Sequence, residues 1–178
     1  MKKFFLLLLM AVVFCGSADA QKGMKGLGVN INGNVTNELL NIGASAKFQY
    51  NISNYFRVEA SAAFYTLSED HYPNEKESGF ESAIIANTHF FVMSPKRIRP
   101  YFIAGIGYAS FNEEYKGYNY SYSNVQEDGL AANVGIGVDW RITSFLSLQA
   151  ECGILSILTD GTEKANGFAF GIGTSYNF

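Results

Sequence analysis

The sequence predicts an all-β protein, an eight-stranded antiparallel up-and-down transmembrane β-barrel. Eight segments of about ten residues alternate large apolar side chains with small or polar ones, which is the period of two typical of a β-strand. Short connections alternate with longer polar ones along the chain, as in barrels that cross a membrane. Outside the N-terminal segment, no apolar run is long enough for a membrane-spanning helix.

Turn-forming polar residues bound the eight alternating segments. The segments span residues 25–35, 42–50, 56–65, 80–92, 100–109, 130–140, 146–154 and 166–178. The connections after the third and fifth segments, 66–79 and 111–128, are long and polar, and we expect loops there. Short turns fall between the other ends of the strands, so the longer connections gather at one end of the barrel.

The N-terminus has the pattern of an export signal. Two lysines precede the apolar run 4–14, and a small-x-small motif ends at Ala20. This pattern predicts a secretory signal peptide over residues 1–20, cleaved between Ala20 and Gln21. Residues 21–178 are then expected to form one barrel domain.

Charge and cysteine content limit the classes of partner and of fold. Without the signal peptide, 11 basic residues (13 minus 2) and 15 acidic residues (16 minus 1) remain, which gives a formal charge of −4. This balance speaks against a nucleic-acid partner. Cys152 is then the one cysteine left in the sequence, so we expect no internal disulfide. Closure of the sheet into a barrel is expected to satisfy the backbone instead.

The last segment ends the chain on an aromatic residue, Phe178. Large apolar side chains occupy one of its faces, and glycine, alanine and serine the other. An exposed strand of this kind invites aggregation in a soluble sheet. We therefore expect its apolar face to meet lipid and its free edge to pair with the first strand near 27–31. Further aromatic residues near both ends of the strands predict two belts at the membrane interfaces.

Four segments then form a recognisable set: Arg-Pro-Tyr-Phe-Ile-Ala-Gly-Ile-Gly-Tyr over 99–108, Gly-Ile-Gly-Val-Asp-Trp over 135–140, the turn beginning at Arg141, and the terminal Ser-Tyr-Asn-Phe. With the signal peptide they resemble the small eight-stranded outer-membrane β-barrels of the OmpX and OmpA transmembrane-domain type, or outer membrane protein beta-barrel domain group. The resemblance implies a monomeric, porin-like protein of the bacterial cell envelope, located in the outer membrane. It further implies contact with outer-membrane lipid and lipopolysaccharide, and an assembly machinery that reads Tyr176 and Phe178.

Ionisable residues on the small and polar faces are expected to point into the barrel. An eight-stranded barrel encloses a lumen just wide enough for side chains to fill, and buried charges need partners. Three basic and three acidic residues give no net charge, so we expect an ion network that plugs the lumen, with a narrow ion pore as the alternative. The members of this expected network are Lys47, Arg57, Glu59, Asp139, Arg141 and Glu151.

The long connections carry the candidates for surface contact. Tyrosine offers amphipathic contact area at binding surfaces, and it recurs in 111–128. A partner bound through 66–79 and 111–128 is therefore one expectation, and extension of the strands above the membrane is the simpler alternative. The candidate contact residues are Tyr115, Tyr118, Tyr120 and Tyr122.

The expected function is that of an integral outer-membrane protein with a role in envelope integrity or surface contact, and with no catalytic, cofactor or metal site. A secreted soluble barrel that binds a small apolar ligand, as lipocalins do, is an alternative that requires the apolar face to point inward. A lipid A-modifying enzyme is another, but His89 is followed by Phe90 and Phe91, which departs from the His and Ser two apart of the barrel deacylases. No Cys/His spacing indicates zinc.

Overall fold

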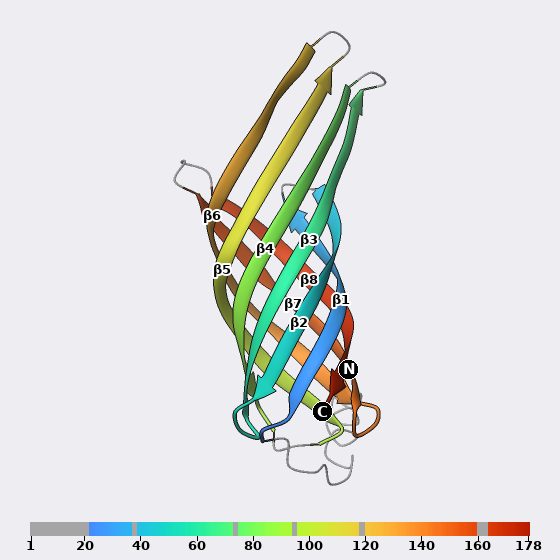
Figure 1. The fold of residues 1–178 in the computed structure, drawn as a ribbon, viewed down its shortest axis with the longest axis vertical. Helices are drawn as coiled ribbons and strands as arrows, with labels where there is room; N and C mark the ends of the chain where they lie inside the picture. Colours follow the sequence, from blue (N-terminus) through green and yellow to red (C-terminus); the bar gives the residue numbers. More distant parts are fainter. Residues whose placement is uncertain (1–21, 37–38, 73–74, 94–95, 118–119, 160–163) are drawn as a thin grey trace, which may run out of the picture.

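In a computed structural model, the chain forms a closed barrel of eight antiparallel strands that follow one another in sequence order (Figure 1). The structure describes residues 22–36, 39–72, 75–93, 96–117, 120–159 and 164–178. The strands are β1 (Lys25–Thr36), β2 (Leu39–Asn51), β3 (Phe56–Tyr72), β4 (Glu75–Phe91), β5 (Ile98–Gly117), β6 (Tyr120–Arg141), β7 (Leu146–Thr159) and β8 (Lys164–Asn177). The predicted fold class is confirmed. None of the described residues forms a helix long and apolar enough to cross a membrane.

Large apolar side chains lie on the outside of the barrel. Ile106, Ile31 and Ile84 are each exposed by 70% or more, whereas the inward-facing Gln49 and Arg57 are 1% exposed. A protein that folds in water buries its apolar side chains, so this inversion suits a lipid surround. The lipocalin-like alternative required the apolar face to point inward, and the observed orientation does not support it.

Pairing of the first and last strands closes the barrel. Leu27 lies opposite Tyr176 and Ile31 opposite Ile172 in the β1–β8 ladder. The Lys25 N–H donates to the Phe178 carbonyl at 2.9 Å, and the Phe178 N–H donates to the Lys25 carbonyl at 2.8 Å. The predicted pairing of the terminal strand with the first strand is thus confirmed, and closure leaves neither strand with a free edge along this ladder.

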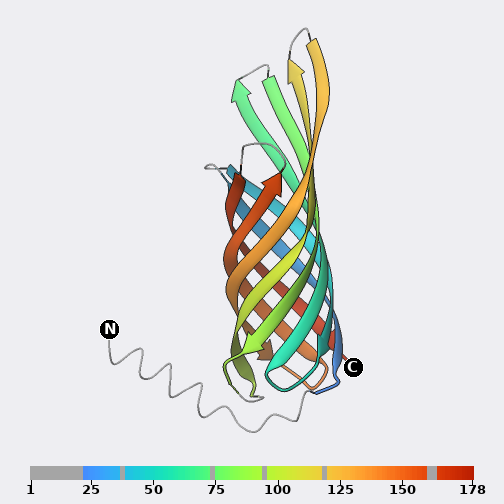
Figure 2. The ribbon, with the colours of Figure 1, turned by 90° about the vertical axis from the view of Figure 1, so that its left-hand side faces the viewer.

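Two predicted loops are wrong, because 66–79 and 111–128 lie largely in strands. The β3–β4 ladder continues to Tyr72 opposite Glu75, and the β5–β6 ladder continues to Gly117 opposite Tyr120. Both hairpins rise well beyond the other strands (Figures 1 and 2). A hairpin with water on both faces needs no apolar alternation, so the polar composition concealed the strands. For 111–128, the simpler alternative, strand extension, is confirmed for the backbone.

Candidate functional site in the barrel lumen

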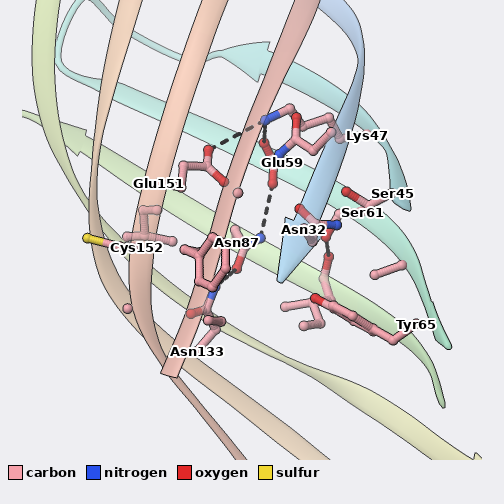
Figure 3. A pocket seen from close by; sticks show the side chains of 18 residues that line it. Asn32, Ser45, Lys47, Glu59, Ser61, Tyr65, Asn87, Asn133, Glu151 and Cys152 are labelled. Carbon is pink, nitrogen blue, oxygen red and sulfur yellow. Dashed lines mark hydrogen bonds and ion pairs between the residues drawn. The ribbon is translucent and has the colours of Figure 1, made fainter. Parts of the chain in front are cut away.

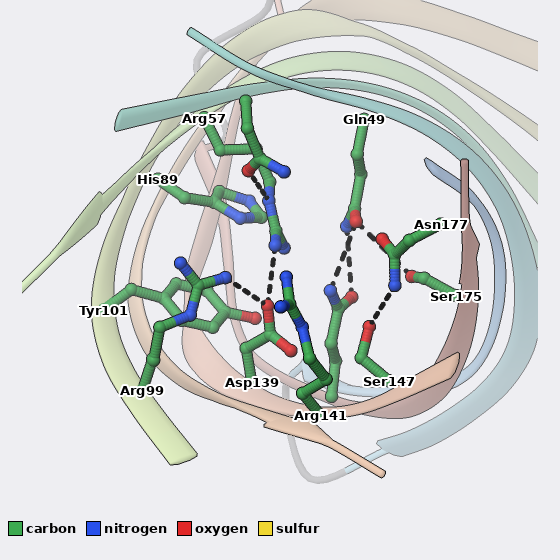
Figure 4. A network of polar contacts seen from close by, with 12 residues as sticks. Gln49, Arg57, His89, Arg99, Tyr101, Asp139, Arg141, Ser147, Ser175 and Asn177 are labelled. Carbon is green, nitrogen blue, oxygen red and sulfur yellow. Dashed lines mark hydrogen bonds and ion pairs between the residues drawn. The ribbon is translucent and has the colours of Figure 1, made fainter. Parts of the chain in front are cut away.

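Polar and charged side chains from inward-facing strand positions fill the lumen at the end of the barrel where the turns are short. Two groups of ion pairs form there, one around Asp139 and one around Lys47 (Figure 4 for the first and Figure 3 for the second). The strand register brings them together, because Arg99 lies opposite Asp139 across β5–β6 and Gln49 lies opposite Glu59 across β2–β3.

The first group, the arginine triad, consists of Arg57, Arg99 and Asp139. Oδ2 of Asp139 accepts hydrogen bonds from the guanidinium groups of Arg57 at 2.6 Å and Arg99 at 2.9 Å. All three side chains are at most 3% exposed. Both guanidinium groups also lie over the ring of Phe91, at 4.9 Å and 3.8 Å from its centroid. Charge-assisted bonds and cation–π contacts therefore hold two buried cations around one carboxylate.

The second group, the lysine cluster, consists of Lys47, Glu59 and Glu151. The Lys47 ammonium lies 3.7 Å from Glu59 Oε2 and 3.4 Å from Glu151 Oε1. Neutral donors complete the cluster: Gln49 donates to Glu59 at 2.8 Å, and the Tyr101 hydroxyl donates to Glu151 at 2.6 Å. With one cation and two carboxylates, this cluster carries a formal charge of −1, which offsets the +1 of the arginine triad.

A layer of neutral polar side chains lies beside these ion pairs. The amides of Gln49 and Gln149 exchange hydrogen bonds at 3.1 Å and 3.2 Å across the lumen. Asn177 donates to the Ser147 hydroxyl at 2.9 Å, and Ser175 donates to Gln49 at 3.4 Å. These five residues are between 0% and 7% exposed, so the layer fills the cross-section with hydrogen-bonded groups.

Toward the other end the lumen becomes apolar. A cluster of buried apolar residues occupies it, formed by Ala83, Ile85, Ala109, Ala131, Leu155 and Ile157. A polar cavity of about 80 Å³ lies in the lumen, and its lining includes Asn30, Ser45, Lys47, Glu59 and Glu151 (Figure 3). In the described part of the chain, side chains therefore fill the lumen at both levels, and this pocket is large enough for a few water molecules.

Sequence reasoning placed six residues in the lumen network, and five of them take part in the two ion-pair groups. The sixth, Arg141, is half-buried and donates to the sulfur of Met24 at 3.5 Å. Arg99 was missed, because residues 93–99 were expected to form a turn, whereas β5 already begins at Ile98. The signal for Arg99 was its position two residues before the inward-facing Tyr101, since a strand alternates faces with period two.

His89 lies beside both groups. It is fully buried, and its ring stacks on Tyr101 with centroids 4.7 Å apart and an interplanar angle of 13°. Among the described residues, neither of its ring nitrogens has a hydrogen-bond partner. A general base must reach the proton it removes, so the described geometry around His89 offers no hydroxyl in that position.

Tyr176 and Phe178, the residues predicted to be read by the assembly machinery, lie where the end of the chain pairs with β1 and closes the barrel. Tyr176 and Phe178 both face outward, with exposures of 56% and 58%, and their rings stack with centroids 6.3 Å apart. Tyr176 also contacts Phe145 at the neighbouring short turn, at 5.8 Å between centroids. Aromatic rings thus gather on the outside of the barrel at the end with the short turns. The predicted signal peptide and its cleavage site between Ala20 and Gln21 lie outside the described residues.

The two long hairpins form one protruding sheet. Its strands are joined to one another, since Lys76 of β4 pairs with Lys116 of β5. Of the predicted contact residues, Tyr115 lies in β5 and Tyr120 and Tyr122 lie in β6, whereas Tyr118 falls outside the described residues. The tyrosine-rich stretch therefore belongs to strands of this sheet.

The outward face changes from apolar to polar along one row of paired residues. Ser82, Ser110 and Asp128 lie side by side across β4, β5 and β6. Two positions closer to the short turns on β4 and β6, Ile84 and Leu130 are 70% and 65% exposed on the same face. On β4, β5 and β6 the apolar part of the outer face ends at this row, and the protruding sheet lies beyond it.

The sequence matches the profile of the outer membrane protein beta-barrel domain over residues 5–178. Among curated proteins, no sequence matches this chain. Solved structures share its fold. Neisserial surface protein A has a TM-score of 0.68 at 13% identity, with 90% of this chain and 100% of that chain covered. Ail, the attachment invasion locus protein of Yersinia pestis, has a TM-score of 0.60 at 15% identity, with 88% and 99% covered. The N-terminal β-barrel domain of Pseudomonas aeruginosa OprF has a TM-score of 0.55 at 18% identity, with 90% and 100% covered.

Proposed function

Because this chain belongs to the outer membrane protein beta-barrel domain family, we propose that it is a monomeric, non-catalytic outer-membrane barrel whose protruding sheet contacts a partner at the cell surface. The barrel serves as a sealed anchor in this proposal, since polar and apolar side chains fill its lumen. Residues 1–20 act as the export signal, and Tyr176 and Phe178 act as the signal for assembly into the membrane.

The observation that carries the proposal is the pair of strand edges that the sheet presents. The β2–β3 ladder ends at Thr66, and the β6–β7 ladder begins at Gly129. Among the described residues, 67–72 of β3 and 120–128 of β6 therefore lack a backbone partner on their outer side. Proteins usually protect such edges, because they pair with any extended chain that reaches them. Here two edges lie beyond the apolar band, which suits recognition by strand addition.

The charge of the protruding sheet further limits the kind of partner that it can bind. The protruding segments 67–72, 75–80, 111–117 and 120–128 carry two lysines, Lys76 and Lys116. Their acidic residues are Glu69, Asp70, Glu75, Glu77, Glu113, Glu114, Glu127 and Asp128. Eight negative charges against two positive charges favour a basic strand, because complementary charge speeds encounter and selects partners. The name of Ail, attachment invasion locus protein, is consistent with a contact role for this fold.

The proposal is tested with bacteria that display the full chain. Their adherence to a surface coated with an alternating Lys-Val peptide is compared with adherence to a second peptide. This control has the same numbers of lysines and valines, but prolines interrupt it, so it cannot extend a sheet. We expect stronger adherence to the uninterrupted peptide, and loss of that difference in a variant shortened by 67–78 and 112–126.

Two results would count against the proposal. Equal adherence to the two peptides would show that charge alone, and not strand pairing, causes binding. Release of the protein from the cell envelope without detergent would remove the membrane anchor on which the proposal depends. The shortened variant is first checked for a folded barrel by its heat-dependent electrophoretic mobility, so that loss of adherence reports on the sheet.

A further inference from the structure

Three metal-binding side chains converge inside the barrel from strands that are distant in sequence. Glu59 of β3, His89 of β4 and Glu151 of β7 each offer a ligand atom, and these atoms all lie within 4.8 Å of one another. His89 is fully buried, its Nε2 lies 3.7 Å from Glu59 Oε2, and neither ring nitrogen has a hydrogen-bond partner among the residues that the structure describes. A buried polar group without a partner is costly. We propose that Glu59, His89 and Glu151 form a binding site for a divalent first-row metal ion such as Zn²⁺.

The donor set fits this class of ion. One imidazole nitrogen and two carboxylate oxygens are ligands that Zn²⁺ accepts, with bonds of about 2.0–2.2 Å. Ligand atoms in a tetrahedral site of that size are about 3.4 Å apart, so the three side chains must approach by about 1 Å. The carboxylates can rotate to do so, whereas stacking on Tyr101 fixes the plane of His89. Because Glu59 and Glu151 line the polar cavity, a water molecule there can supply the fourth ligand.

Lys47 is the internal competitor for this site. Its ammonium lies 3.7 Å from Glu59 and 3.4 Å from Glu151, so it neutralises the same carboxylates that would bind the metal. With His89 neutral, the ammonium and two carboxylates leave a charge of −1, which still favours a cation. Metal binding therefore requires the ammonium to move away from the carboxylates.

The displaced ammonium of Lys47 can move into the cavity. Lys47 lines it together with Ser45, both labelled in Figure 3. Asn30 also belongs to its lining. Oδ1 of Asn30 is buried and accepts no hydrogen bond from the described part of the chain. Asn30 lies opposite Ser45 on β1, the strand next to that of Lys47. Diagonal neighbours on paired strands are within reach of a long side chain. In the loaded state, the ammonium can thus donate to Asn30 while the metal binds His89, and two unpartnered groups gain partners.

The experiment titrates the protein, extracted from the outer membrane in detergent, with Co²⁺, whose visible absorption reports coordination, and then displaces it with Zn²⁺. We expect the wild type to bind Co²⁺. Lys47→Met should bind Co²⁺ about tenfold more tightly or better, because the competing cation is gone. His89→Ala should lose the absorption band. Glu81→Gln removes another buried lumen carboxylate that is not part of the site, and should bind as the wild type does.

The outcomes separate the site from general binding to acidic groups. Absence of a Co²⁺ band in both the wild type and Lys47→Met would overturn the proposal. Equal binding by His89→Ala and the wild type would also overturn it, because the ion would then lie on other carboxylates. Heat-dependent electrophoretic mobility confirms that each variant is folded. Since Lys47→Met is expected to gain affinity, misfolding cannot imitate its predicted result.

Discussion

Replacing Asp139 by asparagine tests how strongly the barrel depends on charge balance in its lumen. The carboxylate accepts from Arg57 at 2.6 Å and from Arg99 at 2.9 Å, and all three side chains are at most 3% exposed. Asparagine has nearly the same volume, so the change leaves no cavity. It leaves two buried guanidinium groups without this anion, and the formal charge of the arginine triad rises from +1 to +2.

The expected loss of stability follows from that geometry. Removing one partner of a buried ion pair destabilises a protein by about 3–5 kcal/mol, because the remaining charge stays buried without compensation. This corresponds to a fall of about two to four orders of magnitude in the ratio of folded to unfolded protein. Cation–π contacts with Phe91 persist in the variant but do not replace the lost charge.

Urea-induced unfolding in detergent or lipid vesicles, followed by electrophoretic mobility, measures the free energy of unfolding. The control is Asp128→Asn, the same chemical change at an exposed position at the end of the apolar band. We expect the control to stay within about 0.5 kcal/mol of the wild type. A decrease of less than about 1 kcal/mol in the free energy of unfolding of Asp139→Asn would refute the reasoning, because removing one partner of a buried ion pair is expected to destabilise the protein more than that.

Three further predictions concern the pairing of β8 with β1, the packing of side chains inside the barrel and the filled lumen. Deleting Phe178 removes its two backbone hydrogen bonds to Lys25, and the fraction of chains inserted into the outer membrane should fall; normal insertion would contradict its role in assembly. Gly137→Ala should destabilise the barrel by about 1–3 kcal/mol in the same urea assay, because the added methyl group would lie 2.5 Å from Cζ of Tyr101; an unchanged midpoint would mean that Tyr101 moves freely. The wild-type protein should show no steady conductance in planar bilayers, and a steady current would favour the pore over the filled lumen.

For each recognised strand, the side chains that face outward could be predicted from the sequence, because this depends only on neighbouring residues of the same strand. On β4, both faces carry apolar residues, yet the burial follows the predicted period of two. Ile84, Thr88 and Phe90 are exposed, whereas Asn87 and His89 are buried. Neighbouring residues of a strand must point to opposite faces. The identity of the lumen residues follows from this rule wherever a strand is recognised.

The predictions were wrong where the sequence pattern did not reveal that a residue belongs to a strand. Residues 66–79 and 111–128 carry few aliphatic and many charged or polar residues, so no alternation of aliphatic side chains marked strands there, and the hairpins were expected to be loops. Arg99 was assigned to a turn that contains Pro95, and the strand was expected to begin at Pro100, whereas it begins at Ile98. In both cases pairing with a neighbouring strand, which depends on residues elsewhere in the chain, decided the structure.

The sequence by itself determined an eight-stranded barrel with an apolar outside, a charged inside and a terminal strand that pairs with the first one. The tertiary structure decided which inward-facing residues meet. Arg57 reaches Asp139 across 82 positions, and Lys47 reaches Glu151 across 104 positions. No spacing in the sequence marks such pairs or the convergence of Glu59, His89 and Glu151, because partners across a lumen are set by the curvature and stagger of the closed sheet.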